Sequence, residues 1–277
     1  MIKENYYPFS VLISVYKNER ASNLDMALNS IENQTVQPDE IILIEDGPLT
    51  PSLETVIKKH QQKSKDKLKC YKFDHNMGLG YALNFGVNKC SNNIIARMDS
   101  DDISVPNRFE LQLKKFESEP NLALLGGQVY EFENKIDNVV SKRWVPLNEM
   151  EIRAFLKYRN PFNHPTVMFK KNAVLNVNNY SNFKGFEDYD LWSKFIEHKY
   201  KVANLSELLV LMRTDEGLYS RRGGIRYLYR YFKLRKLLQR RKIINTREKV
   251  NGDLLMSVNV LIPAFIRKEI YKRFLRK

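Results

Sequence analysis

Three acidic clusters in the chain have side chains that could bind a cation, a nucleotide or a proton. The densest is Arg97-Met98-Asp99-Ser100-Asp101-Asp102, which directly follows an apolar run that ends at Ala96. Its three carboxylates repel one another, so we expect a counter-charge, and a hard divalent cation with oxygen ligands is the natural one. The alternative is a solvated turn that caps a helix beginning near Pro106.

The second cluster, Glu45-Asp46-Gly47, also follows an apolar run. A carboxylate there can accept hydrogen bonds from a base N–H group or a ribose hydroxyl, although an ordinary turn at the end of a strand has the same composition. The nearby run Asn76-Met77-Gly78-Leu79-Gly80 is rich in glycine and opens a predicted helix, whose first amides could face a phosphate. It lacks the Lys-Ser or Lys-Thr pair of a phosphate-binding loop.

The third cluster is Phe186-Glu187-Asp188-Tyr189-Asp190-Leu191-Trp192, in which acids alternate with aromatic residues. A carboxylate in a partly apolar wall suits a general base, because its pKa is then not too low for proton transfer. Acids in the first turn of a helix are equally explained by the helix dipole. His164 stands in a loop between two prolines and could contact a phosphate or an acceptor, or be structural.

The elements that must position these clusters alternate between strand and helix. The predicted strands are 10–15, 40–44, 68–73, 93–98 and 122–129, and the predicted helices between them are 23–34, 53–60, 80–89 and 107–117. Beyond them we expect a hairpin or loop over 130–148, helices over 149–157 and 188–198, and strands over 166–169 and 201–211. The pattern predicts an α/β fold with a mostly parallel sheet covered on both faces, and ligands beyond the carboxyl ends of the strands.

The charge of the chain is unevenly distributed. The 277 residues carry a net charge of +14, but residues 217–277 hold 18 basic and 3 acidic residues, whereas residues 1–216 have a net charge of −1. We therefore expect a catalytic domain over 1–216 and a basic helical extension over 217–277. No apolar run reaches the ~18–20 residues of a membrane span, and no signal peptide is evident. The two cysteines form no disulfide framework, which favours a cytoplasmic location.

The basic extension has two segments with an amphipathic pattern, 225–244 and 266–277. A basic helix with an apolar face is typical of binding to an anionic membrane surface. The alternative is that Leu228, Phe232 and Leu238 pack on the catalytic domain and the cations are solvated. Nucleic-acid binding is a third hypothesis, but it leaves the acidic clusters unexplained, and we expect no nucleic-acid partner.

The ordered set SVLISVYKNE, EIILIEDG, NMGLGYALNFG, ARMDSDD and FEDYDLW resembles the inverting GT-A glycosyltransferases of family 2, especially bacterial enzymes that build O-antigen, capsule or other exopolysaccharides. The resemblance covers about residues 9–215 and implies a GT-A (Rossmann-like) fold. For the nucleotide, it implies contacts with Ser14 and Tyr16, recognition of the base by Asp46, and further contacts with Asn76 and Arg97. For the metal, it implies a DXD-type motif at Asp99 and Asp101, with Asp101 the direct ligand. It implies that Asp188 is the catalytic base.

The resemblance also implies the reaction. A sugar would pass from a nucleotide sugar, usually a UDP-sugar in this family, to a hydroxyl of a glycan or of a polyprenyl-diphosphate-linked saccharide. The cofactor would be Mn²⁺ or Mg²⁺. The enzyme would lie peripherally on the inner face of the bacterial plasma membrane. Two departures are Pro48 after Glu45-Asp46-Gly47 and Ser14 where many members have proline. The alternative enzyme, a sugar-1-phosphate nucleotidyltransferase, has a glycine-rich N-terminal loop, whereas Gly47 is the one glycine in the first 50 residues here.

Overall fold

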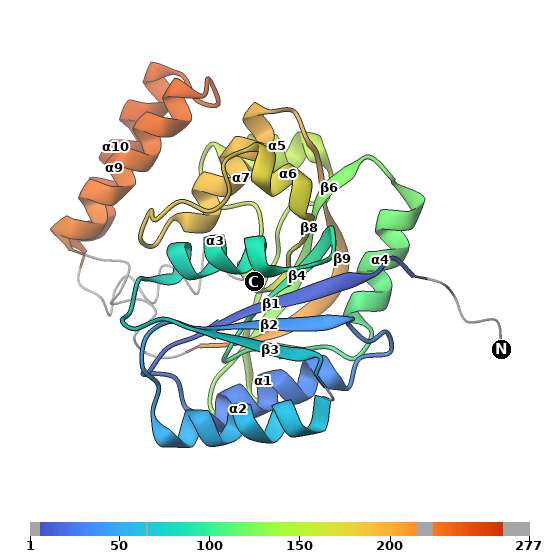
Figure 1. Ribbon diagram of the computed structural model, residues 1–277. Helices are drawn as coiled ribbons and strands as arrows, with labels where there is room; N and C mark the ends of the chain where they lie inside the picture. Colours follow the sequence, from blue (N-terminus) through green and yellow to red (C-terminus); the bar gives the residue numbers. More distant parts are fainter. Residues whose placement is uncertain (1–5, 65, 215–223, 263–277) are drawn as a thin grey trace.

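The computed structural model describes residues 6–64, 66–214 and 224–262, which form one mixed sheet flanked by helices (Figure 1). The strands are β1 (Phe9–Val15), β2 (Glu40–Glu45), β3 (Leu68–Lys72), β4 (Ile94–Asp99), β5 (Ile103–Ser104), β6 (Leu122–Phe132), β7 (Val139–Arg143), β8 (Met168–Lys170) and β9 (Lys201–Arg213). Their order in the sheet is β3-β2-β1-β4-β8-β6-β9-β5, with β7 paired to β6. The helices are α1 (Ala21–Glu32), α2 (Pro51–Ser64), α3 (Leu79–Lys89), α4 (Arg108–Ser118), α5 (Glu149–Leu156), α6 (Lys171–Asn176), α7 (Glu187–Glu197), α9 (Ile225–Arg240) and α10 (Thr246–Leu261).

The first part of the sheet is parallel, as the alternating pattern predicts. β1 pairs in parallel with β2 and β4, and β2 pairs in parallel with β3. The second part is mixed, because β8 is antiparallel to both β4 and β6 while β6 and β9 run in parallel. β7 forms an antiparallel hairpin with β6 inside the region expected to be a hairpin or loop. A parallel partner needs a long crossover, and the short connections of this region do not supply one for β7.

Helices cover both faces of the sheet, which confirms the predicted α/β architecture (Figure 1). One core cluster holds residues of α1, α2 and α4, and the other holds residues of α3, α5, α6 and α7. The central strands are buried on both sides, with Leu12 in one cluster and Ile13 in the other. This double burial explains why these strands read as continuous apolar runs without alternation.

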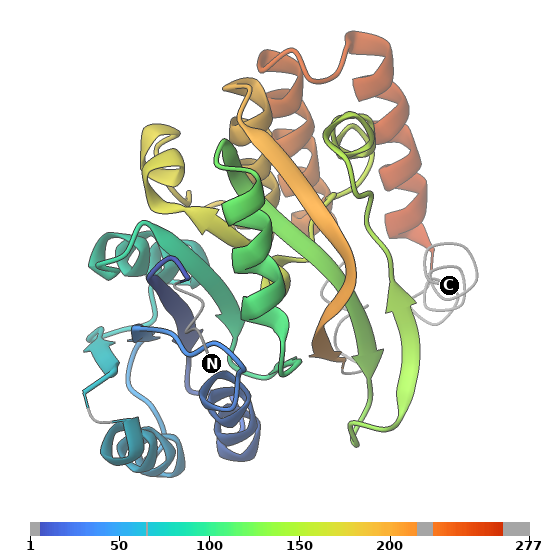
Figure 2. The same ribbon diagram turned by 90° about the vertical axis from the view of Figure 1, so that its right-hand side faces the viewer.

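The helical hairpin α9–α10 packs against the α/β body, residues 6–214, through its first helix (Figures 1 and 2). Leu234 and Leu238 are fully buried in the same core cluster as the residues of α7, and Phe232 packs at its margin. The guanidinium of Arg235 donates hydrogen bonds to the backbone carbonyls of Lys157 and Glu248. The described part of the basic extension is therefore joined to the body by both apolar and polar contacts.

Three elements have no counterpart in the expected pattern: β5, α6 and α10. β5 has two residues and α6 has six, which is too short for a hydrophobic period to emerge. α10 begins at a capping box formed by Asn245 and Glu248. Within the described part of the chain, none of the helices has the length and apolar character of a membrane span. The helix predicted over residues 266–277 lies outside the described residues.

Candidate active site

The carboxyl ends of β1, β2 and β4 meet at one edge of the sheet and bring together four of the predicted site residues. The register places Ser14 beside Asp99 on one side and beside Ile44 on the other. Tyr16 follows β1 and is 45% exposed, so its ring is available to a ligand. Asp46 follows β2 at the same edge and is buried. This is the place where ligands bind in open α/β sheets.

The Asp46 carboxylate organises the glycine-rich loop. It accepts hydrogen bonds from the backbone N–H groups of Met77 at 2.6 Å and Gly78 at 3.0 Å. It also accepts one from the side-chain amide of Asn76 at 2.9 Å, which in addition reaches the backbone carbonyl of Asp46. Asp46 and Asn76 thus contact each other, and their hydrogen bonds fix the loop ahead of α3. One lone pair of the Asp46 carboxylate remains for a further donor.

Arg97 pairs with Asp99 beneath the edge of the sheet. Both guanidinium amino groups of Arg97 donate to the Asp99 carboxylate, one of them at 2.6 Å. The Arg97 side chain is 2% exposed and that of Asp99 is 34% exposed. Arg97 therefore lies below Asp99 and supports it from the interior, while Asp99 itself reaches the surface.

Among the residues that the structure describes, no basic side chain forms an ion pair with Asp101 or Asp102. Burial, together with the charges of Asp99 and Glu19, raises the pKa of the Asp101 carboxyl to about 7. Burial and the neighbouring Asp101 raise the pKa of Asp102 as well; one Asp102 oxygen accepts the backbone N–H of Arg213 at 2.8 Å, and the other is buried without a partner. Burial and, after it, the neighbouring carboxylates disfavour the ionised forms of both groups, and a bound cation would favour those forms.

The donor set fits a hard divalent cation that is also held by a substrate. Asp99 and Asp101 offer carboxylate oxygens, which are the ligands preferred by Mn²⁺ and Mg²⁺. Among the described residues, no group of three or more His, Cys, Asp or Glu side chains is arranged to hold an ion. A cation here would complete its shell with water and phosphate oxygens, as Mg²⁺ commonly does.

Asp188 stands at the start of α7 as a half-buried carboxylate with two hydrogen-bond donors. The side-chain amide of Asn160 donates to one oxygen at 2.5 Å, and the backbone N–H of Tyr189 donates to the other at 2.7 Å. Burial raises the pKa of Asp188 above the ordinary aspartate value, although both donors and the charges of Arg143 and Arg97 favour the ionised form. The carboxylate is therefore oriented, and its pKa is suited to a general base.

The buried charge of Arg97 acts on both acidic groups of the site. It favours the ionised forms of Asp101, Asp102 and Asp188, against the larger effect of burial on their pKa values. It also acts on His164, whose pKa is lowered well below the usual histidine value, first by burial and then by Arg97. His164 is consequently neutral and hydrogen-bonded to the Tyr180 hydroxyl at 3.0 Å, which makes it part of the support under the site.

Gly80 allows the glycine-rich loop to lie against the segment that precedes Asp188. A Cβ atom at this position would stand 2.3 Å from the Ser181 carbonyl oxygen and 3.0 Å from Cγ of Glu187. The close approach brings α3 and α7 together, so the second and third acidic clusters of the sequence border the same site.

Several residues of the site carry no signal in the sequence. Asn160 belongs to the loop noted for His164, but nothing in its spacing points to Asp188. Arg213 at the end of β9 donates to Asp102 through its backbone N–H, and Glu19 accepts a hydrogen bond from Ser100. These are contacts between distant parts of the chain, and only the folded sheet brings them together.

Comparison with known proteins identifies the family. Residues 10–177 match the model of glycosyl transferase family 2. The chain is 37% identical over 270 residues to the Escherichia coli UDP-Gal:alpha-D-GlcNAc-diphosphoundecaprenol beta-1,3-galactosyltransferase, with 97% of each chain covered. It is 34% identical over 265 residues to the amylovoran biosynthesis glycosyltransferase AmsE of Erwinia amylovora, covering 96% of this chain and 98% of the relative.

A solved structure with a similar fold is the mannosyltransferase PcManGT from Pyrobaculum calidifontis in complex with GDP-Man and Mn²⁺. The TM-score is 0.64 at 14% identity, with 94% of this chain and 72% of that chain covered. The chain therefore belongs to glycosyltransferase family 2. It is a glycosyltransferase with the GT-A fold, as the resemblance of its motifs implied.

Proposed function

We propose that the protein is a metal-dependent inverting glycosyltransferase that moves a sugar from a nucleotide sugar, with UDP the expected nucleotide, to a hydroxyl of a polyprenyl-diphosphate-linked saccharide or other glycan in bacterial surface polysaccharide synthesis. The observation that supports it most is the convergence of the acidic clusters. Asp46 and Asp99 lie at the carboxyl ends of the two strands that flank β1. The close approach at Gly80 brings the start of α7, which contains Asp188, against the loop held by Asp46. The names of the two relatives support the acceptor class and the pathway.

The nucleotide side of the site consists of residues at the ends of β1 and β2. The exposed ring of Tyr16 offers a flat apolar face for the base, and Ser14 lies in the groove beside Asp99. Asp46, with Asn76, holds the loop at the start of α3 in place, and its free lone pair is directed to a donor group of the base or ribose. Arg97 is buried under Asp99 and holds its carboxylate by an ion pair, so in this proposal its effect on the nucleotide is indirect.

Asp101 and Asp99 would hold Mn²⁺ or Mg²⁺ together with the two phosphates of the donor. The bound cation supplies positive charge next to the leaving nucleoside diphosphate. The raised pKa of Asp101 is consistent with this role, because a cation removes the repulsion that raises it. Asp101 is the direct ligand in this proposal, and Asp99, fixed by Arg97, is nearer the ribose or a metal-bound water.

Asp188 accepts the proton of the acceptor hydroxyl while that oxygen attacks the anomeric carbon from the face opposite the leaving group. A single displacement of this kind inverts the configuration. Asn160 and the Tyr189 N–H orient the carboxylate, and they remain hydrogen-bonded to it while it takes the proton. Proton transfer by a positioned base contributes about 10²–10⁴ in rate.

We place the enzyme at the inner face of the bacterial plasma membrane, where a lipid-linked acceptor is reached. The support is the acceptor printed in the name of the E. coli relative, together with the basic character of residues 217–277. The family assignment favours this function over a sugar-1-phosphate nucleotidyltransferase, which would release pyrophosphate in place of UDP.

A panel of UDP-, GDP- and dTDP-sugars tests the proposal. Thermal stabilisation and slow hydrolysis are measured with and without Mn²⁺, for the wild type and for Asp101→Asn. We expect one UDP-sugar to raise the melting temperature in the presence of Mn²⁺, and the variant to lose this response. Asp137→Asn, an exposed aspartate between β6 and β7, is the matched control and should respond as the wild type does. A wild type that responds to no nucleotide sugar with Mn²⁺ would contradict the proposal.

A further inference from the structure

The outer face of α10 is apolar and exposed. Val250, Leu254, Leu255 and Val258 are 56%, 64%, 71% and 54% exposed, respectively. They recur at helical spacing on the side opposite Met256, which packs against the core. Four exposed aliphatic side chains on one side of one helix exceed the scattered hydrophobic residues of an ordinary surface. We call these four residues the α10 apolar face.

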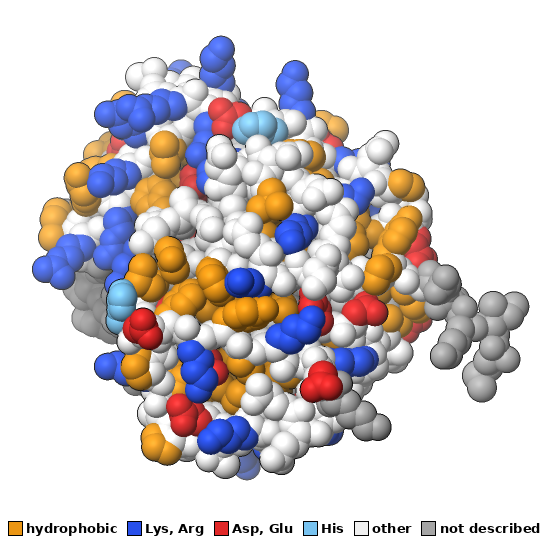
Figure 3. Space-filling model, viewed as in Figure 1, with side chains coloured by type: hydrophobic (Ala, Val, Ile, Leu, Met, Phe, Trp, Pro, Cys, Tyr) orange, Lys and Arg blue, Asp and Glu red, His pale blue; other side chains and the backbone are white. Residues whose placement is uncertain are grey.

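The neighbouring helix α9 is cationic and has no acidic residue. It contains six basic residues, Arg226, Arg230, Lys233, Arg235, Lys236 and Arg240. Figure 3 shows Lys and Arg side chains interspersed with hydrophobic ones at the edge of the molecule where the hairpin lies. Among the residues that the structure describes, Arg226, Lys233 and Lys236 make no ion pair. The hairpin thus combines apolar side chains with an excess of positive charge.

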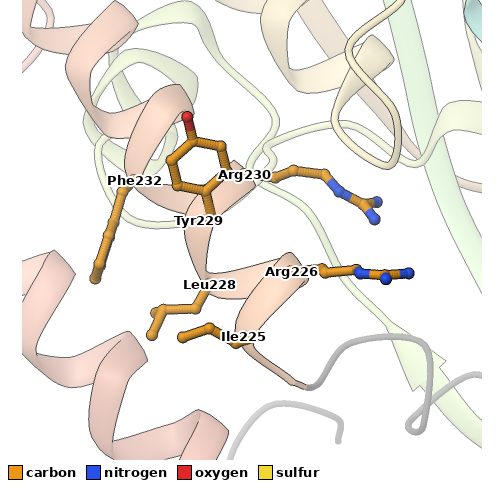
Figure 4. Close-up of a pocket in the computed structure, with 6 residues that line it drawn as sticks. All are labelled: Ile225, Arg226, Leu228, Tyr229, Arg230 and Phe232. Carbon is orange, nitrogen blue, oxygen red and sulfur yellow. The ribbon is translucent and has the colours of Figure 1, made fainter.

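The first half of α9 is itself amphipathic. A hollow of about 560 Å³ is lined there by Ile225, Arg226, Leu228, Tyr229, Arg230 and Phe232. Figure 4 shows Ile225, Leu228 and Phe232 on one side of the helix, while Arg226 and Arg230 extend to the other. Apolar groups next to guanidinium groups match the boundary between the acyl chains and the phosphates of a bilayer.

The same helix contacts the segment that contains the proposed base. The rings of Tyr227 and Tyr231 lie 5.3 Å and 6.2 Å from that of Phe186, two residues before Asp188. Arg230 donates a hydrogen bond to the Lys184 carbonyl at 3.2 Å. The hairpin that carries the exposed apolar residues therefore packs directly on the segment before α7, which contains the proposed base.

We propose that the α10 apolar face and the cations of α9 form a docking surface for an anionic lipid bilayer. The apolar side chains enter the interfacial region, and Arg226, Lys233 and Lys236 contact lipid phosphates. This inference names the surface that would hold the enzyme at the membrane. The biological reason for the docking rests on the proposed function, whereas the binding of the surface to lipid does not. Charge complementarity selects an anionic bilayer, because a neutral partner would leave the cations of α9 without counter-charges.

Vesicle sedimentation of the full-length protein tests the proposal. The vesicles contain phosphatidylcholine alone or phosphatidylcholine mixed with phosphatidylglycerol. We expect the wild type to bind the mixed vesicles, with binding reduced by added salt. The double variant Leu254→Glu/Leu255→Glu should bind the mixed vesicles at least about tenfold more weakly. Two side chains that would enter the bilayer are replaced in it by negative charges, which anionic lipids repel. The matched control is Tyr7→Glu, an exposed position just before β1, whose first residues lie on the side away from the hairpin (Figure 1).

Circular dichroism and the stabilisation of each variant by UDP and Mn²⁺ in solution separate docking from folding and donor binding. The Leu254→Glu/Leu255→Glu variant should keep the circular dichroism spectrum of the wild type and its stabilisation by UDP and Mn²⁺. Equal binding of this variant and the wild type to mixed vesicles would overturn the proposal, as would a wild type that binds no anionic vesicle. Concentration-dependent dimers that the double variant abolishes, without vesicle binding, would identify the surface as a protein interface and overturn it too. Vesicle binding without any nucleotide-sugar response would refute the proposed function and leave the docking surface standing.

Discussion

Replacement of Asn160 by alanine tests how the environment of Asp188 sets its basicity. The Asn160 amide donates to the Asp188 carboxylate at 2.5 Å, and this hydrogen bond favours the ionised form. A hydrogen bond to a charged group contributes about 1.5–3 kcal/mol, and one pKa unit corresponds to about 1.4 kcal/mol. Because the half-buried carboxylate regains some water, we expect the Asn160→Ala variant to raise the Asp188 pKa by about one unit.

The direction of the effect on activity follows from the protonation state. The base works only when it is ionised, so a higher pKa moves the acid limb of the profile of kcat/KM against pH to higher pH. At pH values below the Asp188 pKa, the rate of sugar transfer should therefore fall about tenfold, and at pH values above it the loss should be much smaller. The assay is UDP release with a saturating acceptor between pH 5 and 9, with Asn138→Ala in the β6–β7 hairpin as control. An equal loss at every pH, with the acid limb unmoved, would refute this explanation of the Asn160 contact.

Four further predictions concern stability and can be checked by calorimetry without metal at pH 8. Asp99→Asn should lower the melting temperature because it leaves the Arg97 guanidinium, 2% exposed, without its charged partner. Asp101→Asn should stabilise by about 1–2 kcal/mol, since a carboxyl whose folded pKa is raised to about 7 costs stability as the pH rises above its unfolded pKa of about 4, and the full cost is present at pH 8. Arg241→Met should destabilise by about 1.5–3 kcal/mol, because the guanidinium lies 2.7 Å from the buried carboxylate of Asp190, which would keep, among the described residues, only Lys194 and the Ser181 hydroxyl as partners. Gly80→Ala should destabilise the fold by about 1–3 kcal/mol and impair sugar transfer, since the added Cβ atom would clash with the Ser181 carbonyl oxygen. For each of the four variants, a melting temperature equal to that of the wild type would contradict the prediction.

The parallel half of the fold follows from the sequence to a large extent. Runs such as Ile41 to Ile44 are short, apolar and flanked by helical periodicity, so strands 9–15, 40–45 and 94–99 and their shared edge are predictable. Once they are parallel neighbours, the acids that follow them must converge. The antiparallel half is less predictable. The strand predicted over 166–169 overlaps β8, but nothing in its residues predicts that it pairs antiparallel with β4 and β6, and the two residues of β5 have no pattern of their own.

The contacts within the site are less predictable than its location. Spacing indicates that Asp46, Asp99 and Asp188 belong to one site, but it does not show that the Asp46 carboxylate is occupied by the loop before α3. Nor does it reveal that Arg97 lies beneath Asp99, since a basic residue two positions before an acid is common in strands. The contact of Arg241 with Asp190 joins residues 51 positions apart, and it depends on how α9 packs against α7.

The interpretation of the basic extension changes with the structure. Its charge alone predicts a solvated or membrane-bound appendage, whereas the described part has a buried inner side and an exposed outer side. Leu234 and Leu238 face the body, and Leu254 and Leu255 face away from it. Truncation of residues 217–277 would therefore remove part of the core along with any membrane contact, so point variants on the outer side are the sharper experiment.

The central claim is that Asp188 is the base of a metal-dependent sugar transfer, and the most direct measurement compares donor binding with transfer in Asp188→Asn. The variant keeps the size of the side chain and removes its basicity. We expect stabilisation by UDP and Mn²⁺ to match that of the wild type, while transfer to the acceptor falls by about 10²–10⁴. Transfer at the wild-type rate by a folded Asp188→Asn protein would contradict the claim.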